Sequence, residues 1–199
     1  MTDLLLGTTN AGKQREFRRL LAGLPGRVVS PQEIGLGLEV PEPHHTYADN
    51  ATAKAAAYCA ASGLITVADD SGIEAAALGW GPGVRSARFG DQAAGHADRM
   101  LAALADATDR RARMVCALAV ATPGDDEPTV EVFTGVMEGT IASERRGTGG
   151  FGYDPIFLLA EGITTAELPE GEKDRISHRG RAVAAATPYL RQLLSAPAR

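Results

Sequence analysis

The segment Leu64-Ile65-Thr66-Val67-Ala68-Asp69-Asp70-Ser71-Gly72 joins an apolar run to a polar end. The apolar run follows Gly63 and predicts a buried β-strand. Successive strand residues point to opposite faces, so an extended backbone turns only one of Asp69 and Asp70 toward a site. The residues alone do not say which one. A carboxylate at the end of a buried strand suits a hard cation or an attacking water, and an ordinary Asp-Ser-Gly turn is the alternative.

Composition favours one soluble domain over residues 1–199. The chain is 44% hydrophobic and 23% charged, and its net charge of −5 argues against a nucleic-acid or membrane surface. No apolar run is long enough to span a bilayer, and the N-terminus has no basic segment before its short apolar run, so we expect no signal peptide. Cys59 and Cys116 lie in apolar segments without metal-type spacing, which predicts buried free thiols in a reducing cytoplasm.

Lysine is rare in this chain. Only Lys13, Lys54 and Lys173 stand among the 20 lysine and arginine residues. Arginine serves at the other basic positions, so these three are candidates for sites that need a compact ammonium group. Coincidence is the alternative explanation.

The N-terminal segment has the pattern of a phosphate-binding loop. Leu4–Leu6 is a short apolar strand, Gly7–Lys13 is a polar turn, and apolar residues from Phe17 onward recur with helical spacing. Backbone N–H groups at such a helix start favour an anion. The segment lacks the ending of a Walker A loop, and an ordinary strand-to-helix turn with a surface lysine is the alternative.

An alanine-rich run predicts a helix over Tyr47–Ala61, with Asn50 and Lys54 on one face. The loop before it holds Glu42 between two prolines, which stiffens the backbone there. The pair His44-His45 raises the possibility of a metal site, but adjacent loop histidines without partner spacing are expected to be exposed.

Two later segments also carry candidate binding residues. The glycine-rich stretch 147–155 allows close approach of a ligand, and Phe151 and Tyr153 offer faces on which a base can stack. Ser177 predicts the start of the last helix, with His178 and Arg179 in its first turn. Basic residues there oppose the helix dipole, which favours a role in ligand binding.

Strands and helices alternate at first, then residues 114–121 and 130–137 predict a hairpin, and a strand and a helix follow. This order predicts an α/β fold with a mixed sheet. Cations beside two or three carboxylates describe a polyphosphate site with Mg²⁺. Histidine and arginine donors suit a ring carbonyl better than an exocyclic amine.

Five ordered motifs together resemble the inosine triphosphate pyrophosphatase family (the RdgB/HAM1-like type). They are Thr8–Lys13, Glu42 with Thr46–Ala55, Ala68–Gly72, Gly149–Phe157 and Ser177–Gly180. The resemblance implies a mixed central sheet flanked by helices, with two lobes around an active-site cleft. It also implies a homodimer that uses Mg²⁺ to hydrolyse noncanonical purine nucleoside triphosphates (ITP, dITP, XTP) to the monophosphate and pyrophosphate.

The resemblance also implies roles for individual residues. Glu42 and Asp70 are the metal ligands, and Asp70 is the catalytic proton acceptor. The implied substrate-binding residues are Thr8, Thr9, Asn10, Ala11, Gly12, Lys13, Lys54, Ser71, Phe151, Gly152, Tyr153, Asp154, Lys173, His178 and Arg179. The chain departs from the family pattern where Asp49 replaces a common glutamate and where His44-His45 replaces a glycine-containing stretch.

Two other functions compete with this one. A Maf-like pyrophosphatase acting on pyrimidine or modified nucleotides is the nearest rival. A nucleotide-binding regulatory module without catalysis is the second, although pure binding needs no general base.

Overall fold

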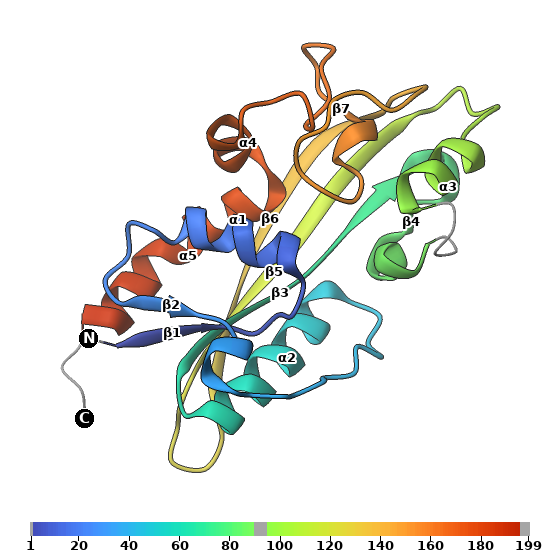
Figure 1. Cartoon of the computed structure of the whole chain (residues 1–199). Coiled ribbons are helices and arrows are strands. Elements are labelled where there is room, and N and C mark those ends of the chain that lie inside the picture. Colours follow the sequence, from blue (N-terminus) through green and yellow to red (C-terminus); the bar gives the residue numbers. More distant parts are fainter. Residues whose placement is uncertain (1, 90–94, 196–199) are drawn as a thin grey trace. The chain divides into compact units, whose positions relative to one another are not determined.

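A computed structural model describes residues 2–89 and 95–195 and has the predicted α/β fold (Figure 1). The helices are α1 Ala11–Leu20, α2 Tyr47–Ser62, α3 His96–Ala103, α4 Glu170–Ile176 and α5 His178–Ser195. The strands are β1 Asp3–Leu6, β2 Arg27–Val29, β3 Ile65–Ala75, β4 Gly81–Pro82, β5 Arg111–Thr122, β6 Thr129–Ile141 and β7 Phe157–Leu158.

The sheet is mixed, as the sequence predicted. Its strand order is β2-β1-β3-β5-β6-β7, and β4 pairs with β3. β1 is parallel to β2 and β3, whereas the β3–β4 and β6–β7 pairs are antiparallel. β5 and β6 are neighbours joined by the short connection 123–128, which confirms the predicted hairpin.

The chain divides into two compact units. Unit 1 comprises Met1–Asp70, Cys116–Gly135 and Arg179–Arg199, and unit 2 comprises Ser71–Val115 and Val136–His178. The two lobes and the cleft implied by the resemblance stay predictions.

The polar end of the opening segment is strand, not turn. β3 continues through Asp69, Asp70 and Gly72 to Ala75, so the alternative of an Asp-Ser-Gly turn is wrong. β1 pairs with β3 as far as Val67, and β4 pairs with it at Glu74 and Ala75. Strand pairing before and after the polar residues outweighs their local turn preference. The two aspartates therefore point to opposite faces of the sheet.

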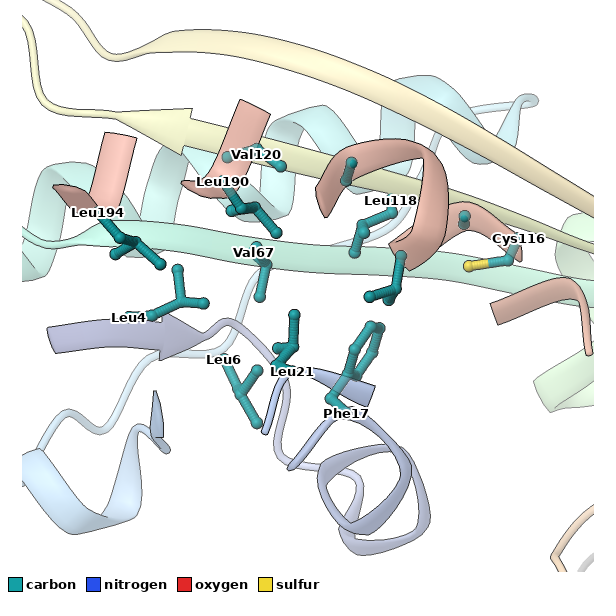
Figure 2. Packing of buried hydrophobic residues seen from close by; sticks show 13 residues of the cluster. Leu4, Leu6, Phe17, Leu21, Val67, Cys116, Leu118, Val120, Leu190 and Leu194 are labelled. Atoms are coloured by element: carbon teal, nitrogen blue, oxygen red, sulfur yellow. The ribbon is translucent and has the colours of Figure 1, made fainter. Parts of the chain in front are cut away.

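One face of the unit 1 sheet is covered by α1 and α5. Phe17 of α1, Leu21 just after α1, and Leu190 and Leu194 of α5 meet Val67 of β3 in one buried cluster (Figure 2). Val67 and Asp69 share a strand face by alternation, so Asp69 points toward α1 and α5.

The other face of the unit 1 sheet is covered by α2. Ala51, Ala55 and Cys59 of this helix pack on Ala68 of β3 and on alanines of β5. Small side chains on both elements let helix and sheet approach closely, and alternation places Asp70 on this face with Ala68. The helix spans Tyr47–Ser62 and confirms the predicted one almost to the residue.

Unit 2 has its own core. Ile73, Met114, Met137 and Phe157 from the strands pack with Met100 of α3. Both cysteines are buried and free, as predicted, and none of the helices within the described residues is long and apolar enough to cross a membrane.

Candidate active site

The loop between β1 and α1 is shaped by its own polar side chains. Asn10 caps α1, since its side-chain oxygen accepts a hydrogen bond from the Lys13 amide at 3.0 Å. Thr8 Oγ1 accepts from the Asn10 amide at 3.2 Å. These bonds order the loop and the first turn of α1, where backbone N–H groups suit an anion.

A buried cluster of charges surrounds Asp69. Lys13 Nζ lies 3.0 Å from Asp69 Oδ1, and Arg179 donates to Asp69 Oδ2 at 3.1 Å. Arg179 also donates to Glu16 at 2.5 Å. Glu16, Asp69 and Arg179 are all buried, so two cations and two carboxylates neutralise one another beneath the loop.

The charge state of Asp69 follows from these partners. Burial by itself favours the neutral acid, but the Lys13 ammonium and the Arg179 guanidinium outweigh it and lower the pKa of this carboxyl well below its ordinary value. Asp69 is therefore an anion that positions two cations. This arrangement also explains why a basic residue is tolerated in the first turn of α5, because protein carboxylates neutralise the charge of Arg179. Contact of Arg179 with substrate stays a prediction.

Asp70 has a different environment on the opposite face. Its Oδ2 accepts a hydrogen bond from the Asn50 side chain at 2.9 Å, and the residue is 6% exposed. Burial raises the pKa of Asp70 above its ordinary value, although the Asn50 bond and the ammonium groups of Lys13 and Lys54 oppose that shift. A buried carboxylate with a raised pKa is a better proton acceptor than an exposed one.

Lys54 is paired with Glu42 and lies near Asp70. Lys54 forms an ion pair with Glu42 and interacts electrostatically with both Asp69 and Asp70. Burial, and next the nearby Lys13 ammonium, lower the pKa of Lys54. Both predicted metal ligands therefore lie around one lysine in unit 1.

The donor set suits a cation that binds few protein groups. Within residues 2–89 and 95–195, no group of three or more histidine, cysteine, aspartate or glutamate side chains is arranged to hold a metal. Glu42 and Asp70 are hard oxygen donors, and Mg²⁺ commonly takes only one or two carboxylates and completes its shell with waters and substrate phosphates. The residues present fit such an ion. His44 and His45 are exposed, as expected from the sequence.

The predicted base-binding loop in unit 2 is organised by Asp154. Its Oδ2 accepts from Lys173 Nζ at 2.6 Å and from the Phe151 amide at 2.7 Å, and its Oδ1 accepts from Thr165 Oγ1 at 2.9 Å. Gly150 has a φ of 68°, and a Cβ at this position would lie 2.0 Å from Asp154 Oδ2. Only glycine lets the loop close on this carboxylate.

The aromatic side chains of this loop have different surroundings. Lys173 Nζ lies 5.5 Å from the centre of the Phe151 ring, whereas Tyr153 is buried and donates its hydroxyl to the Ser86 carbonyl at 2.8 Å. Phe151, only partly buried, is the better candidate for stacking. His178 is buried at the start of α5, and Ser71 is partly buried on β3.

We expect Asp154→Asn to lower the free energy of unfolding by about 2 kcal/mol. The amide cannot compensate the buried Lys173 ammonium, and one of its atoms becomes a donor facing other donors. Urea denaturation measures the loss. The control is Asp98→Asn, whose exposed pair with Arg145 at 3.2 Å makes a change of less than about 1 kcal/mol the expected result. Equal losses in the two variants would contradict the role given to Asp154.

All three lysines have carboxylate partners, and their need for a compact ammonium group stays a prediction. Lys13 pairs with Asp69, Lys54 with Glu42 and Lys173 with Asp154. Their side chains are 16%, 12% and 6% exposed, so none is a solvated surface lysine, and that alternative is wrong for Lys13.

The sequence analysis did not include Asn50 and Glu16 among the predicted site residues, although both contact residues of that set. Asn50 contacts Asp70, and Glu16 contacts Arg179. The position of Asn50 one turn before Lys54 was a signal for the first. A buried carboxylate on the otherwise apolar face of α1 gave no comparable signal for Glu16.

Comparisons with known proteins identify the family of this chain. A family model described as the Ham1 family matches residues 4–189. A curated dITP/XTP pyrophosphatase of Mycobacterium tuberculosis is 47% identical over 203 residues, covering 97% of each chain. Another, from Gloeobacter violaceus, is 48% identical over 184 residues, covering 92% of this chain and 91% of the relative.

Solved structures give the same result. A HAM1 protein from Coxiella burnetii is 37% identical with a TM-score of 0.84, covering 96% of this chain and all of the other. A nucleoside-triphosphatase / dITP/XTP pyrophosphatase from Mycobacterium abscessus is 41% identical with a TM-score of 0.71, covering 94% and 100%. With matches of this extent, the chain belongs to the Ham1 family.

Proposed function

We propose that this chain is a nucleoside triphosphate pyrophosphatase that hydrolyses noncanonical purine nucleotides (ITP, dITP and XTP) to the monophosphate and pyrophosphate. The observation that carries the proposal is the arrangement of charges in unit 1. Lys13 pairs with Asp69 at 3.0 Å, Lys54 pairs with Glu42, and the neighbouring Asp70 is a buried carboxylate. A general base beside two ammonium groups suits attack on a phosphate chain. The names of the relatives support the substrate class.

We propose that Glu42 and Asp70 would hold a Mg²⁺ ion together with substrate phosphates. Such an ion supplies charge stabilisation at the phosphate oxygens. The support is the hard oxygen donor pair gathered around Lys54.

Each of the remaining protein groups has a separate role in hydrolysis. Asp70 accepts a proton from the water that attacks the α-phosphorus, and pyrophosphate leaves. Lys13 and Lys54 stabilise the negative charge that develops on the phosphate oxygens. The loop Thr8–Gly12 and Ser71 complete the triphosphate contacts, with backbone N–H groups as donors.

We propose that the purine base is recognised by residues in the second half of the chain. Phe151 stacks on the base, while Gly152, Tyr153, Asp154 and Lys173 shape its surroundings. His178 and Arg179 donate to a ring carbonyl such as the 6-oxo group of hypoxanthine. ATP presents an amino group at that position and would leave buried donors unpaired, which can cost factors of about 10⁴.

A nucleotide panel tests this function directly. We expect Mg²⁺-dependent release of pyrophosphate from dITP, ITP and XTP, with kcat/KM for ATP lower by about 10⁴. The panel also contains dTTP and UTP, and a reaction without metal is the control. Preference for the pyrimidines would favour a Maf-like enzyme, and nucleotide binding without pyrophosphate release would favour a regulatory module.

We also infer a cytoplasmic homodimer, on the strength of the family resemblance and the buried free cysteines. Sedimentation equilibrium of the purified chain tests the assembly, and a monomer at micromolar concentration would contradict it.

A further inference from the structure

Asn50 connects the two segments that carry the proposed metal ligands. Its Oδ1 accepts from the His44 amide at 3.0 Å, and its Nδ2 donates to the His44 carbonyl at 3.3 Å. The same Nδ2 donates to Asp70 Oδ2 at 2.9 Å. The side chain thus bonds a loop residue two positions beyond Glu42 and a carboxylate on β3.

The chemistry of this contact requires a carboxamide. An asparagine side chain has two N–H donors and one carbonyl oxygen, and here both donors and the oxygen are used. The reverse orientation of the amide would place Oδ1 against a carbonyl and a carboxylate oxygen, so the orientation is fixed by its partners. Aspartate would lack the donors, and serine would have only one.

The position of the contact also matters. Asn50 is 2% exposed on α2, whose buried face is packed on the sheet, so its amide is held by a rigid element. Pro41 and Pro43 restrict the backbone on both sides of Glu42. Because the backbone between them is stiff, a bond that fixes His44 also restricts the position of Glu42.

We propose that Asn50 is a positioning residue that sets the spacing of Glu42 and Asp70 and thereby the affinity for the divalent cation. The inference rests on the proposed function, because it assumes that these two carboxylates bind the ion. Asn50 would not touch the ion or the substrate. It orients one ligand directly, through Oδ2 of Asp70, and the other through the loop backbone.

This role also explains why the loop accommodates His44-His45. Asn50 contacts only the backbone N–H and C=O of His44, so the side chain at position 44 does not enter the contact. The departure from the family pattern at these positions leaves the link to Asp70 intact.

Binding of Mn²⁺ to the full chain tests the proposal. Electron paramagnetic resonance of free Mn²⁺ is recorded in a titration with a dITP analogue that carries an α,β-methylene bridge. We expect Asn50→Ala to weaken Mn²⁺ binding about 10-fold to 100-fold, as for other residues that orient metal ligands. The Mg²⁺ dependence of pyrophosphate release should shift by the same factor, so that excess metal restores part of the lost rate.

The matched control is Thr46→Ala. Thr46 caps the same helix by accepting from the Asp49 amide at 3.1 Å, and removal of its hydroxyl weakens this helix end without removing the side-chain hydrogen bonds of Asn50. Mn²⁺ binding within about twofold of wild type is the expected result for a change outside the metal's surroundings. If the alanine variant does not fold, Asn50→Ser, which keeps one donor, takes its place. We expect a smaller loss of Mn²⁺ affinity in that variant.

The outcomes separate the two proposals. Wild-type Mn²⁺ affinity in the Asn50 variants, or an equal loss in Thr46→Ala, overturns the positioning role while pyrophosphate release by the wild type still stands. A wild-type chain that releases no pyrophosphate from any nucleotide, but whose Mn²⁺ binding depends on Asn50, overturns the function alone. A wild-type chain that binds no Mn²⁺ overturns the positioning role, and pyrophosphate release then decides the function separately.

Discussion

Replacing Asp70 by asparagine is expected to lower kcat for dITP by about 10²-fold to 10⁴-fold, the usual contribution of a positioned general base. The amide keeps the size of the side chain but cannot accept the proton of the attacking water. Lys13 and the loop before it keep their nucleotide contacts, so nucleotide affinity measured without metal should change little. Single-turnover pyrophosphate release gives the rate, and fluorescence titration with the α,β-methylene analogue gives the affinity.

The control for this variant is Asp125→Asn. Asp125 is an exposed carboxylate in the connection between β5 and β6 of unit 1. The same chemical change there should leave kcat at the wild-type value. Undiminished turnover of the Asp70 variant would refute the assignment of the proton acceptor.

Replacing Asp69 by alanine is expected to lower the free energy of unfolding by about 3–5 kcal/mol, the loss typical when one partner of a buried ion pair is removed. Lys13 and Arg179 would keep their charges near a site that has lost its central carboxylate. Urea denaturation at neutral pH measures the effect, since the lowered pKa of Asp69 keeps it ionised there.

An exposed pair in the same unit is the comparison for this loss. Asp3 pairs with Arg27 at 2.7 Å, but the arginine side chain is 68% exposed. Water screens and solvates both groups, so Asp3→Ala should cost a small fraction of the Asp69 loss. Equal effects in the two variants would show that the Asp69 cluster is not the compensated buried network described above.

Local pattern predicted the elements that hold the site. The apolar run before Asp69 gave β3, the helical spacing after Lys13 gave α1, and the alanine-rich run gave α2. These predictions succeeded because strand and helix periodicity are properties of neighbouring residues. The end of β3 could not be predicted from local pattern. The turn preference of Asp-Ser-Gly is a local property, whereas the strand pairing that overrides it involves residues distant in sequence.

The different surroundings of Asp69 and Asp70 depend on contacts distant in sequence. Asp69 meets Lys13 across 56 positions and Arg179 across 110, while Asp70 meets Asn50 across 20. Strand alternation predicts that the two carboxylates face opposite sides of the sheet. The helices that cover each side determine which carboxylate is neutralised by cations and which accepts a hydrogen bond from an amide.

Sequence pattern was sufficient to predict the α/β class and the order of the main elements, because both depend on local spacing and residue type. It also named candidate residues for a polyphosphate site, which stay predictions. The tertiary structure alone decided the pairing of the three lysines, the enclosure of Asp69 and the link from Asn50 to Asp70. Those features arise where helices from distant segments pack on opposite faces of one strand, and burial there makes each charge depend on the partner it meets.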